Sequence, residues 1–84
     1  MEFDPEKDKK NLAKHGISLV RAADLDLDQA LVREDTRFDY GERRWIAIGP
    51  IDGALYVLVF TRRPQLRAIS LRPANEKETK LWLS

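Results

Sequence analysis

An apolar run over residues 55–61 constrains the fold more than any other feature of this chain. The run is rich in β-branched and aromatic residues and is too short for a typical helix, so it predicts a strand covered on both faces. Residues 62–65 interrupt it with charge and a proline, and a second run over residues 66–71 follows at once. Two strands joined by a short polar turn form an antiparallel hairpin. We therefore expect this hairpin at the centre of a sheet.

The second strand of the hairpin carries arginine in an alternating pattern. Strand alternation predicts that Ala68, Ser70 and Arg72 point to one face of the sheet, and that Arg67 and Leu71 point to the other. Arg67 and Arg72 are thus expected on opposite faces unless a β-bulge intervenes. A guanidinium held on a rigid strand suits phosphate, because its planar fork matches two oxygens at once.

The first helix is marked at both of its ends. Asp4 supplies an N-cap carboxylate, and Pro5 occupies the first helical position, where its missing N–H is not needed. The helix should run to His15 and end at Gly16. Leu12 is its only large apolar residue after the first turn. So polar a helix is weakly anchored by packing, which leaves its side chains available for other contacts.

Capping and alternation signals predict the remaining elements. The order helix, helix, four-stranded antiparallel meander, short C-terminal helix is an α+β fold with the helices on one side of the sheet. Residues 1–84 are expected to form a single domain. The further elements are a helix over 19–25 capped by Ser18, strands over 30–34 and 44–48, a turn over 50–53, and a last helix opened by Asn75 with Glu78 as its capping box.

Composition argues against several kinds of site. The chain has no cysteine, so it can form neither a disulfide nor a thiolate zinc site. It has one histidine and no carboxylates at ligand spacing, so we expect no metal and no cofactor. No apolar stretch approaches membrane-spanning length, and the first residues are charged rather than signal-like. We therefore expect a cytoplasmic protein that does not bind membranes.

Charge is strongly segregated along the chain despite a net charge of +1. Residues 1–42 contain seven Lys/Arg and eleven Asp/Glu, a net charge of −4. Residues 43–72 contain six arginines and one aspartate, a net charge of +5. Segregation of this kind favours a polyanionic partner on one face, although charged stretches also occur on ordinary solvated surfaces.

A set of residues in fixed order along nearly the whole chain is more specific than any single motif within it. The set comprises Phe3-Asp4-Pro5-x-Lys7, Asn11, Lys14-His15-Gly16, Ser18, Asp39-Tyr40-Gly41-Glu42-Arg43, Ile48-Gly49, Thr61-Arg62, Arg67-x-Ile69-Ser70-x-Arg72-x-Ala74 and Glu78. This ordered set resembles the BrnT-like toxins. Three positions depart from the pattern of that family: Phe3 replaces a tryptophan, Pro73 a basic residue and Trp82 a tyrosine.

The resemblance implies a fold, an activity and a partner. The implied fold is that of the RelE-like toxins, and the implied activity is cleavage of RNA, which would inhibit translation. Because the chain also lacks cysteine and clustered ligands, we expect this cleavage to be metal-independent. The implied partner is a BrnA-like antitoxin, and we expect two copies of each chain in the complex if the antitoxin dimerises. Operator DNA would be bound only through that antitoxin.

Metal-free RNA cleavage sets the chemical requirements for the site. The 2′-hydroxyl must lose a proton, the charge on the scissile phosphate must be stabilised, and the leaving 5′-oxygen must gain a proton. His15 titrates nearest neutrality, and Glu42, Tyr40 and Lys14 are further candidates for proton transfer. The residues expected in catalysis are His15, Glu42, Arg67 and Arg72, and those expected to bind RNA phosphates are Lys14, Arg43 and Arg62.

Each candidate also has a simpler explanation. His15 suits a helix C-terminus, because its charge interacts favourably with the helix dipole. Glu42 is expected to pair with Arg43 or Arg44, and Glu78 is explained as a cap. The alternative function is an interaction or regulatory module that binds an antitoxin without cleaving RNA. Direct DNA binding is less well supported, because no helix-turn-helix arrangement is present.

Overall fold

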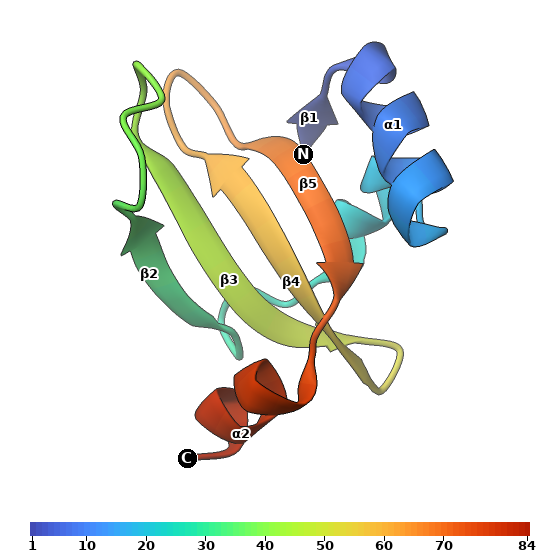
Figure 1. Cartoon of the computed structure of the whole chain (residues 1–84), viewed down its shortest axis with the longest axis vertical. Coiled ribbons are helices and arrows are strands. Elements are labelled where there is room, and N and C mark those ends of the chain that lie inside the picture. The colour runs from blue at the N-terminus through green and yellow to red at the C-terminus, as the bar shows by residue number, and fades with distance from the viewer.

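The chain, described over residues 1–84 in a computed structural model, contains five strands and three helices (Figure 1). In chain order these are β1 (Glu2–Phe3), α1 (Pro5–His15), the 3₁₀ helix η1 (Leu19–Asp24), β2 (Leu31–Asp35), β3 (Arg44–Ile51), β4 (Ala54–Thr61), β5 (Arg67–Pro73) and α2 (Glu76–Leu83). The strands form one sheet in the order β1-β5-β4-β3-β2. The expected α+β class and the central position of the β4–β5 hairpin are confirmed.

The sheet has one strand more than the sequence predicts. β1 lies parallel to β5 on its outer side, with Glu2 opposite Arg67 and Phe3 opposite Ala68. The expected four-stranded antiparallel sheet is therefore wrong in both strand number and direction, although β2 to β5 do form an antiparallel meander. Two residues are too few to show a period of two, so the sequence gives no signal for this strand.

β3 is longer than expected, and the turn after it is shorter. The strand continues through Pro50 to Ile51, whereas a turn over residues 50–53 was predicted. Pro50 is tolerated because β2 pairs with β3 only as far as Ile48. The turn itself consists of Asp52 (φ 49°) and Gly53 (φ 82°). Positive φ at both residues gives the tight turn that matches the twist of a β-hairpin.

β5 contains a bulge where it pairs with β4. Val59 is opposite Ser70, but the next residue of β4, Phe60, is opposite Ala68. Ile69 is therefore an extra residue without a partner of its own, which defines a β-bulge. Beyond it, every side chain of β5 is shifted to the other face of the sheet.

The bulge corrects the predicted alternation of β5. Ala68 and Leu71 both reach the core and are 0% exposed, although simple alternation places them on opposite faces. Arg67, Ser70 and Arg72 consequently share the other face of the sheet. The prediction allowed that a β-bulge would place Arg67 and Arg72 on the same face, and this is what the structure shows.

The core lies between η1 and one face of the sheet. Leu19 and Ala22 of η1 are 1% exposed and pack with Leu58 and Phe60 of β4, which are fully buried. Gly49 of β3 has no side chain, which allows the segment that carries Ala30 to pack closely against the strand. A Cβ atom at that position would lie 3.0 Å from the Cβ atom of Ala30. Burial of this apolar surface is the main force holding η1 to the sheet.

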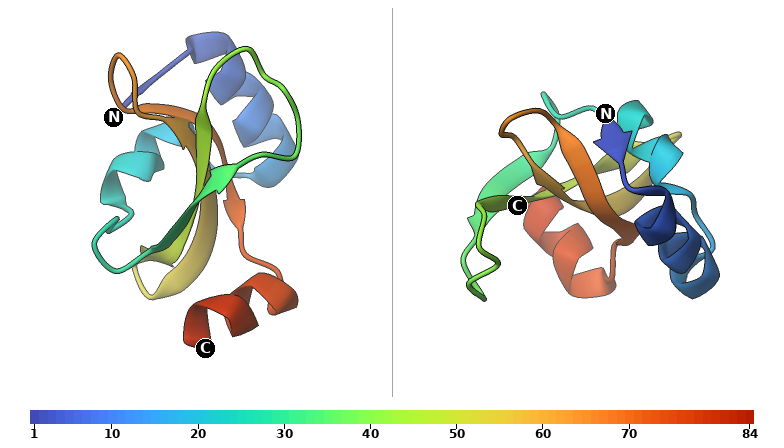
Figure 2. Two further views of the ribbon diagram at one scale, coloured as in Figure 1. Left: turned by 90° about the vertical axis from the view of Figure 1, so that its left-hand side faces the viewer. Right: turned by 90° about the horizontal axis from the view of Figure 1, so that it is seen from above.

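The prediction that all helices lie on one side of the sheet is wrong. Figure 2 shows η1 and α2 on opposite sides of the sheet. Leu81 of α2 lies with Leu31, Ile46 and Ile48, which form a second apolar patch on the face away from η1. That patch requires its own cover, and α2 supplies it. None of the helices is long and apolar enough to cross a membrane.

Asn11 fastens α1 to the outer edge of β5. Its side-chain amide donates to the backbone oxygen of Leu71 at 2.8 Å, and its Oδ1 accepts from the Leu71 N–H at 3.0 Å. The amide also donates to the Ile17 oxygen at 2.9 Å. Asn11 is only 5% exposed, so these backbone groups are paired where water has little access.

Replacing Asn11 by alanine is expected to lower the free energy of unfolding by about 2–4 kcal/mol, because it leaves buried backbone groups of Leu71 and Ile17 without partners. Asn11→Asp should be at least as damaging, since a carboxylate cannot donate to the two carbonyls. Urea unfolding followed by tryptophan fluorescence measures both. Leu12→Ala, at an exposed position of the same helix, is the control and should change stability by less than about 0.5 kcal/mol. Equal stability of Asn11→Ala and the control would contradict this role.

Candidate functional site

The face of the sheet opposite η1 carries arginines from three strands. Arg33 of β2, Arg44 of β3, and Arg67 and Arg72 of β5 share it by strand register; these four residues are called the arginine face below. Figures 1 and 2 show that α1, α2 and the loop between β2 and β3 lie around this side of the sheet. The arrangement places several fixed positive charges on one surface, as binding of a polyanion requires.

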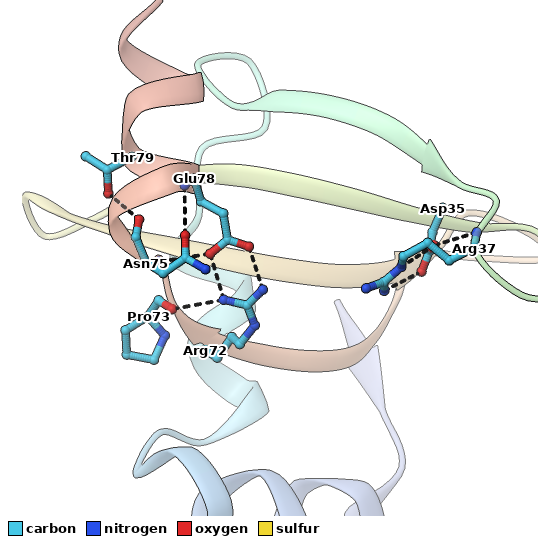
Figure 3. A network of polar contacts seen from close by, with 7 residues as sticks. All are labelled: Asp35, Arg37, Arg72, Pro73, Asn75, Glu78 and Thr79. Carbon is cyan, nitrogen blue, oxygen red and sulfur yellow. Dashed lines mark hydrogen bonds and ion pairs between the residues drawn. The ribbon is translucent and has the colours of Figure 1, made fainter.

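Arg72 is held by an ion pair with Glu78 at the start of α2 (Figure 3). Its two terminal nitrogens donate to the two carboxylate oxygens of Glu78 at 2.8 and 2.6 Å. Glu78 also accepts from the Asn75 N–H at 2.9 Å, which confirms the predicted capping box. Hydrogen bonding to Glu78 raises the pKa of Arg72, and the same bonds lower the pKa of Glu78. The ion pair itself was not predicted, because the cap alone explained Glu78.

His15 and Lys14 lie beside β5 at the end of α1. They line a pocket of about 220 Å³ together with Lys7, Lys10, Asn11, Ile69 and Ser70. Partial burial lowers the pKa of His15 below its ordinary 6.5, and the positive charges of Lys14 and Arg72 lower that pKa further. The ring is therefore mainly uncharged at neutral pH and able to accept a proton. Two of the predicted site residues, His15 and Lys14, line this pocket, and Arg72 is near enough for its charge to act on His15.

A buried carboxylate fixes the loop between β2 and β3. The side chain of Asp35 has no exposed surface and accepts from the Arg37 guanidinium at 2.8 and 2.9 Å. It also accepts from the Tyr40 hydroxyl at 2.9 Å. The hydrogen bonds from Arg37, and then that from Tyr40, hold the pKa of Asp35 well below its usual range. Figure 3 shows the Asp35–Arg37 and Arg72–Glu78 pairs toward opposite ends of the strands.

Two predicted proton-transfer residues have other partners in this loop. Glu42 accepts from Nε of Arg44 at 3.0 Å, one of the two pairings expected of it as a plain surface carboxylate. The Tyr40 hydroxyl donates a hydrogen bond to Asp35, and the Arg44 guanidinium lies 4.2 Å from the centre of the Tyr40 ring. A phenol that donates to a buried carboxylate is poorly placed to act as a base.

The predicted phosphate-binding residues Arg43 and Arg62 lie away from His15. Both guanidiniums lie over the ring of Trp45, at 5.0 and 4.2 Å from its centre. Strand register places Trp45 on the η1 side of the sheet. Arg43 also donates to both carboxylate oxygens of Glu34 at 2.9 and 3.0 Å. These two arginines are therefore separate from the arginine face.

The predicted Arg67 lies on the arginine face, and of two arginines that were not predicted, Arg44 lies on it and Arg37 lies near it. Arg67 is exposed on the arginine face and forms no ion pair. Arg37 lies close enough to Arg72 for its positive charge to oppose the rise in the Arg72 pKa. Arg44 was predictable from alternation with Ile46, whereas Arg37 falls in an expected polar connection where position gives no direction. No group of three or more His, Asp or Glu side chains is arranged to hold a metal ion.

The fold and the site together define a small α+β protein with an arginine-bearing sheet face and a histidine beside its outer strand β5. The chain belongs to the family of BrnT ribonuclease toxins of type II toxin–antitoxin systems, whose family model matches residues 3–78. Membership of a type II system implies an antitoxin partner. The resemblance noted in the sequence is therefore confirmed.

A solved member of this family has a similar structure. The crystal structure of the Brucella abortus ribonuclease toxin BrnT superposes with a TM-score of 0.70 and 30% sequence identity. The match covers 90% of this chain and 96% of that chain. The comparison with curated proteins found no match.

The positions that depart from the family pattern have defined places in the structure. Phe3 lies in β1 and packs against the core. Pro73 is the last residue of β5, opposite Tyr56. Trp82 donates from its indole N–H to the Gln29 oxygen at 3.1 Å, which ties α2 to the segment before β2. The departures are thus accommodated without loss of an element.

Replacing Asp35 by asparagine is expected to destabilise the protein at pH 7 by about 1–2 kcal/mol, since charge-assisted hydrogen bonds are lost. The pKa of Asp35 is lowered in the folded state, so its contribution is present above the unfolded value of about 3.9 and is lost as the pH falls. The stability difference from the unmodified protein should therefore shrink below about pH 4. Urea midpoints from pH 3 to 8 measure this. Asp28→Asn, at an exposed position, is the control, and a difference independent of pH would contradict the assignment.

Proposed function

We propose that this chain cleaves RNA on its arginine face without a metal ion and thereby inhibits translation in the cytoplasm. We also propose that its fold is of the RelE-like type. The observation that carries the proposal is that His15 and Ser70 line one pocket, because Ser70 shares its face of the sheet with Arg72 and the Arg72 charge lowers the pKa of His15. A proton acceptor next to a phosphate-binding cation is the minimum that this reaction needs.

The proposed reaction starts at the 2′-hydroxyl of the RNA. His15 accepts its proton, and the resulting oxygen attacks the adjacent phosphorus, forming a cyclic phosphate as the bond to the 5′-oxygen breaks. Arg72 stabilises the charge that develops on the phosphate oxygens. Lys14 lies beside His15 and carries a proton that the leaving 5′-oxygen can take.

The ion pair with Glu78 is compatible with phosphate binding by Arg72. A guanidinium has five N–H donors, and three hydrogen bonds, two to Glu78 and one to the Pro73 oxygen, are formed here. The remaining donors are available to a phosphate oxygen. Arg67 and Arg44 add charge on the same face, while Arg43, Arg62 and Glu42 are more distant contributors in this proposal.

Purified protein in EDTA is expected to cleave single-stranded RNA, and His15→Gln should cleave about a hundredfold more slowly at nearly unchanged RNA affinity. The pKa of His15 lies below 6.5, so the rise in rate that depends on it should occur below pH 6.5 and disappear in the variant. Single-turnover rates across pH 4–8 measure this. Cleavage that needs added divalent metal, or an unchanged pH profile in His15→Gln, would contradict the mechanism.

Arg72→Ala is expected to weaken RNA binding and cleavage together, by about five- to 150-fold, because a charge-assisted contact is lost. Arg72→Lys should recover only part of this loss, since an ammonium cannot reproduce a two-pronged contact. Arg21→Ala is the control, because Arg21 lies on η1 across the sheet and pairs with Asp24 and Asp52. Circular dichroism checks that each variant is folded. Wild-type binding by Arg72→Ala would remove Arg72 from the site.

We propose a BrnA-like antitoxin as the partner, with an acidic or helical segment laid across the arginine face. Two copies of each chain are proposed in the complex, and operator DNA is bound through the antitoxin. Co-expression with the product of the neighbouring reading frame should give a stable complex of that mass by light scattering, and the complex should not cleave RNA. A complex that cleaves RNA at the rate of the free chain would show that the partner does not cover the arginine face.

A second candidate is a module that binds an antitoxin and does not cleave RNA. The observation in its favour is that Arg72, Glu42 and Tyr40 already have partners within the protein. The assay in EDTA separates the two functions, because the module would bind the antitoxin and leave RNA intact.

A further inference from the structure

Phe38 is an aromatic residue that the proposed reaction does not use. Its side chain is 68% exposed and lies in the loop between β2 and β3. Figure 2 shows this loop projecting from the same side of the sheet as α2, away from η1. The Phe38 ring contacts that of Tyr40, and Tyr40 contacts Arg44, so Phe38 lies beside the arginine face.

The loop that carries Phe38 is held in place on both sides of this residue. Before it, the Arg37 backbone N–H donates to Asp35 at 3.2 Å, in addition to the guanidinium contacts. After it, the Gly41 N–H donates to Asp39 at 3.0 Å, and Tyr40 is anchored to Asp35 by its hydroxyl. An exposed ring on an anchored loop loses little freedom on binding a ligand.

The surroundings of the ring are aromatic and cationic. Phe38 meets Tyr40 edge to face, with ring centres 5.9 Å apart and planes at 74°. Arg44 lies over the Tyr40 ring at 4.2 Å, and Arg37 precedes Phe38 in the chain. Single exposed apolar side chains are common on proteins. Phe38 differs from them because an anchored loop holds its ring against Tyr40, which in turn contacts Arg44 of the arginine face.

We propose that Phe38 is a stacking site for an unpaired nucleobase of single-stranded RNA, with Arg37 binding the phosphate next to that base. The inference rests on the proposed ribonuclease function and adds how the substrate is recognised. Every base offers a flat π-face, so an aromatic ring binds single strands with little regard to sequence. A base within a duplex is already stacked and paired and cannot use the ring.

The test measures RNA affinity by fluorescence anisotropy in the His15→Gln background, in which cleavage is expected to be slow compared with binding. Three labelled probes of equal length are used: a single strand, a single strand with abasic sites and a duplex. Phe38→Ala is expected to weaken binding of the intact single strand by about tenfold, as for other base–aromatic contacts. Binding of the abasic strand and of the duplex should stay within about twofold, because neither offers an unpaired base.

Two further substitutions separate stacking from simple apolar contact. Phe38→Trp keeps a π-face and should retain single-strand affinity, while Phe38→Leu keeps apolar surface without a ring and should lose most of it. Val20→Ala is the matched control, because Val20 is 57% exposed on η1 across the sheet. Circular dichroism checks that the variants fold.

The outcomes separate this inference from the proposed function. Cleavage by the unmodified protein, together with equal single-strand affinity of Phe38→Ala and Val20→Ala, overturns the stacking site and leaves the ribonuclease function standing. An equal loss on all three probes also overturns it, since that result shows no dependence on a base. Base-dependent binding through Phe38 without any cleavage supports the stacking site and rejects the catalytic function.

Discussion

The side-chain amide of Asn11 binds the backbone groups at the edge of β5 that a further strand of the sheet would otherwise bind. β1 covers only the start of β5, and an uncovered edge exposes backbone donors and acceptors that must find partners. Asn11 satisfies both polar groups of Leu71 and so fixes α1 against the strand at one point. His15 lies one helical turn further along, which brings it next to Ser70 and within the field of Arg72. A sparsely packed helix is thus tied to the strand by one polar residue, while Asp8 ties it to the start of η1.

The bulge at Ile69 solves a conflict between packing and charge. The core needs small or apolar side chains at Ala68 and Leu71, three positions apart, which a regular strand cannot supply on one face. One extra residue meets that need and turns Arg67 and Arg72 to the same side. The surface proposed to bind RNA is therefore a by-product of how the opposite face is packed.

Local signals predicted the local structure, and long-range pairing decided the rest. Asp4, Gly16 and Asn75 mark helix ends by chemistry that acts within a few residues, so both α-helices were predictable. β1 was not, because a strand of two residues exists only through its partner. The side of the sheet that α2 covers, and the direction of Arg37, depend on contacts distant in sequence or on loop geometry. No single motif predicts that His15 and Arg72 belong to one site. That prediction came from the family resemblance over the whole chain.

The Arg72–Glu78 pair restricts how this protein can diverge. Glu78 accepts from the N-cap of α2 and neutralises a guanidinium on β5, so a change at either position leaves the other without its partner. Loss of Glu78 removes both a helix cap and a counter-charge, whereas loss of Arg72 leaves a carboxylate still favoured by the helix N-terminus. For the fold, Glu78 is therefore the more constrained of the two positions, because it serves the helix and the strand at once. Arg72 is constrained instead by the proposed binding of RNA.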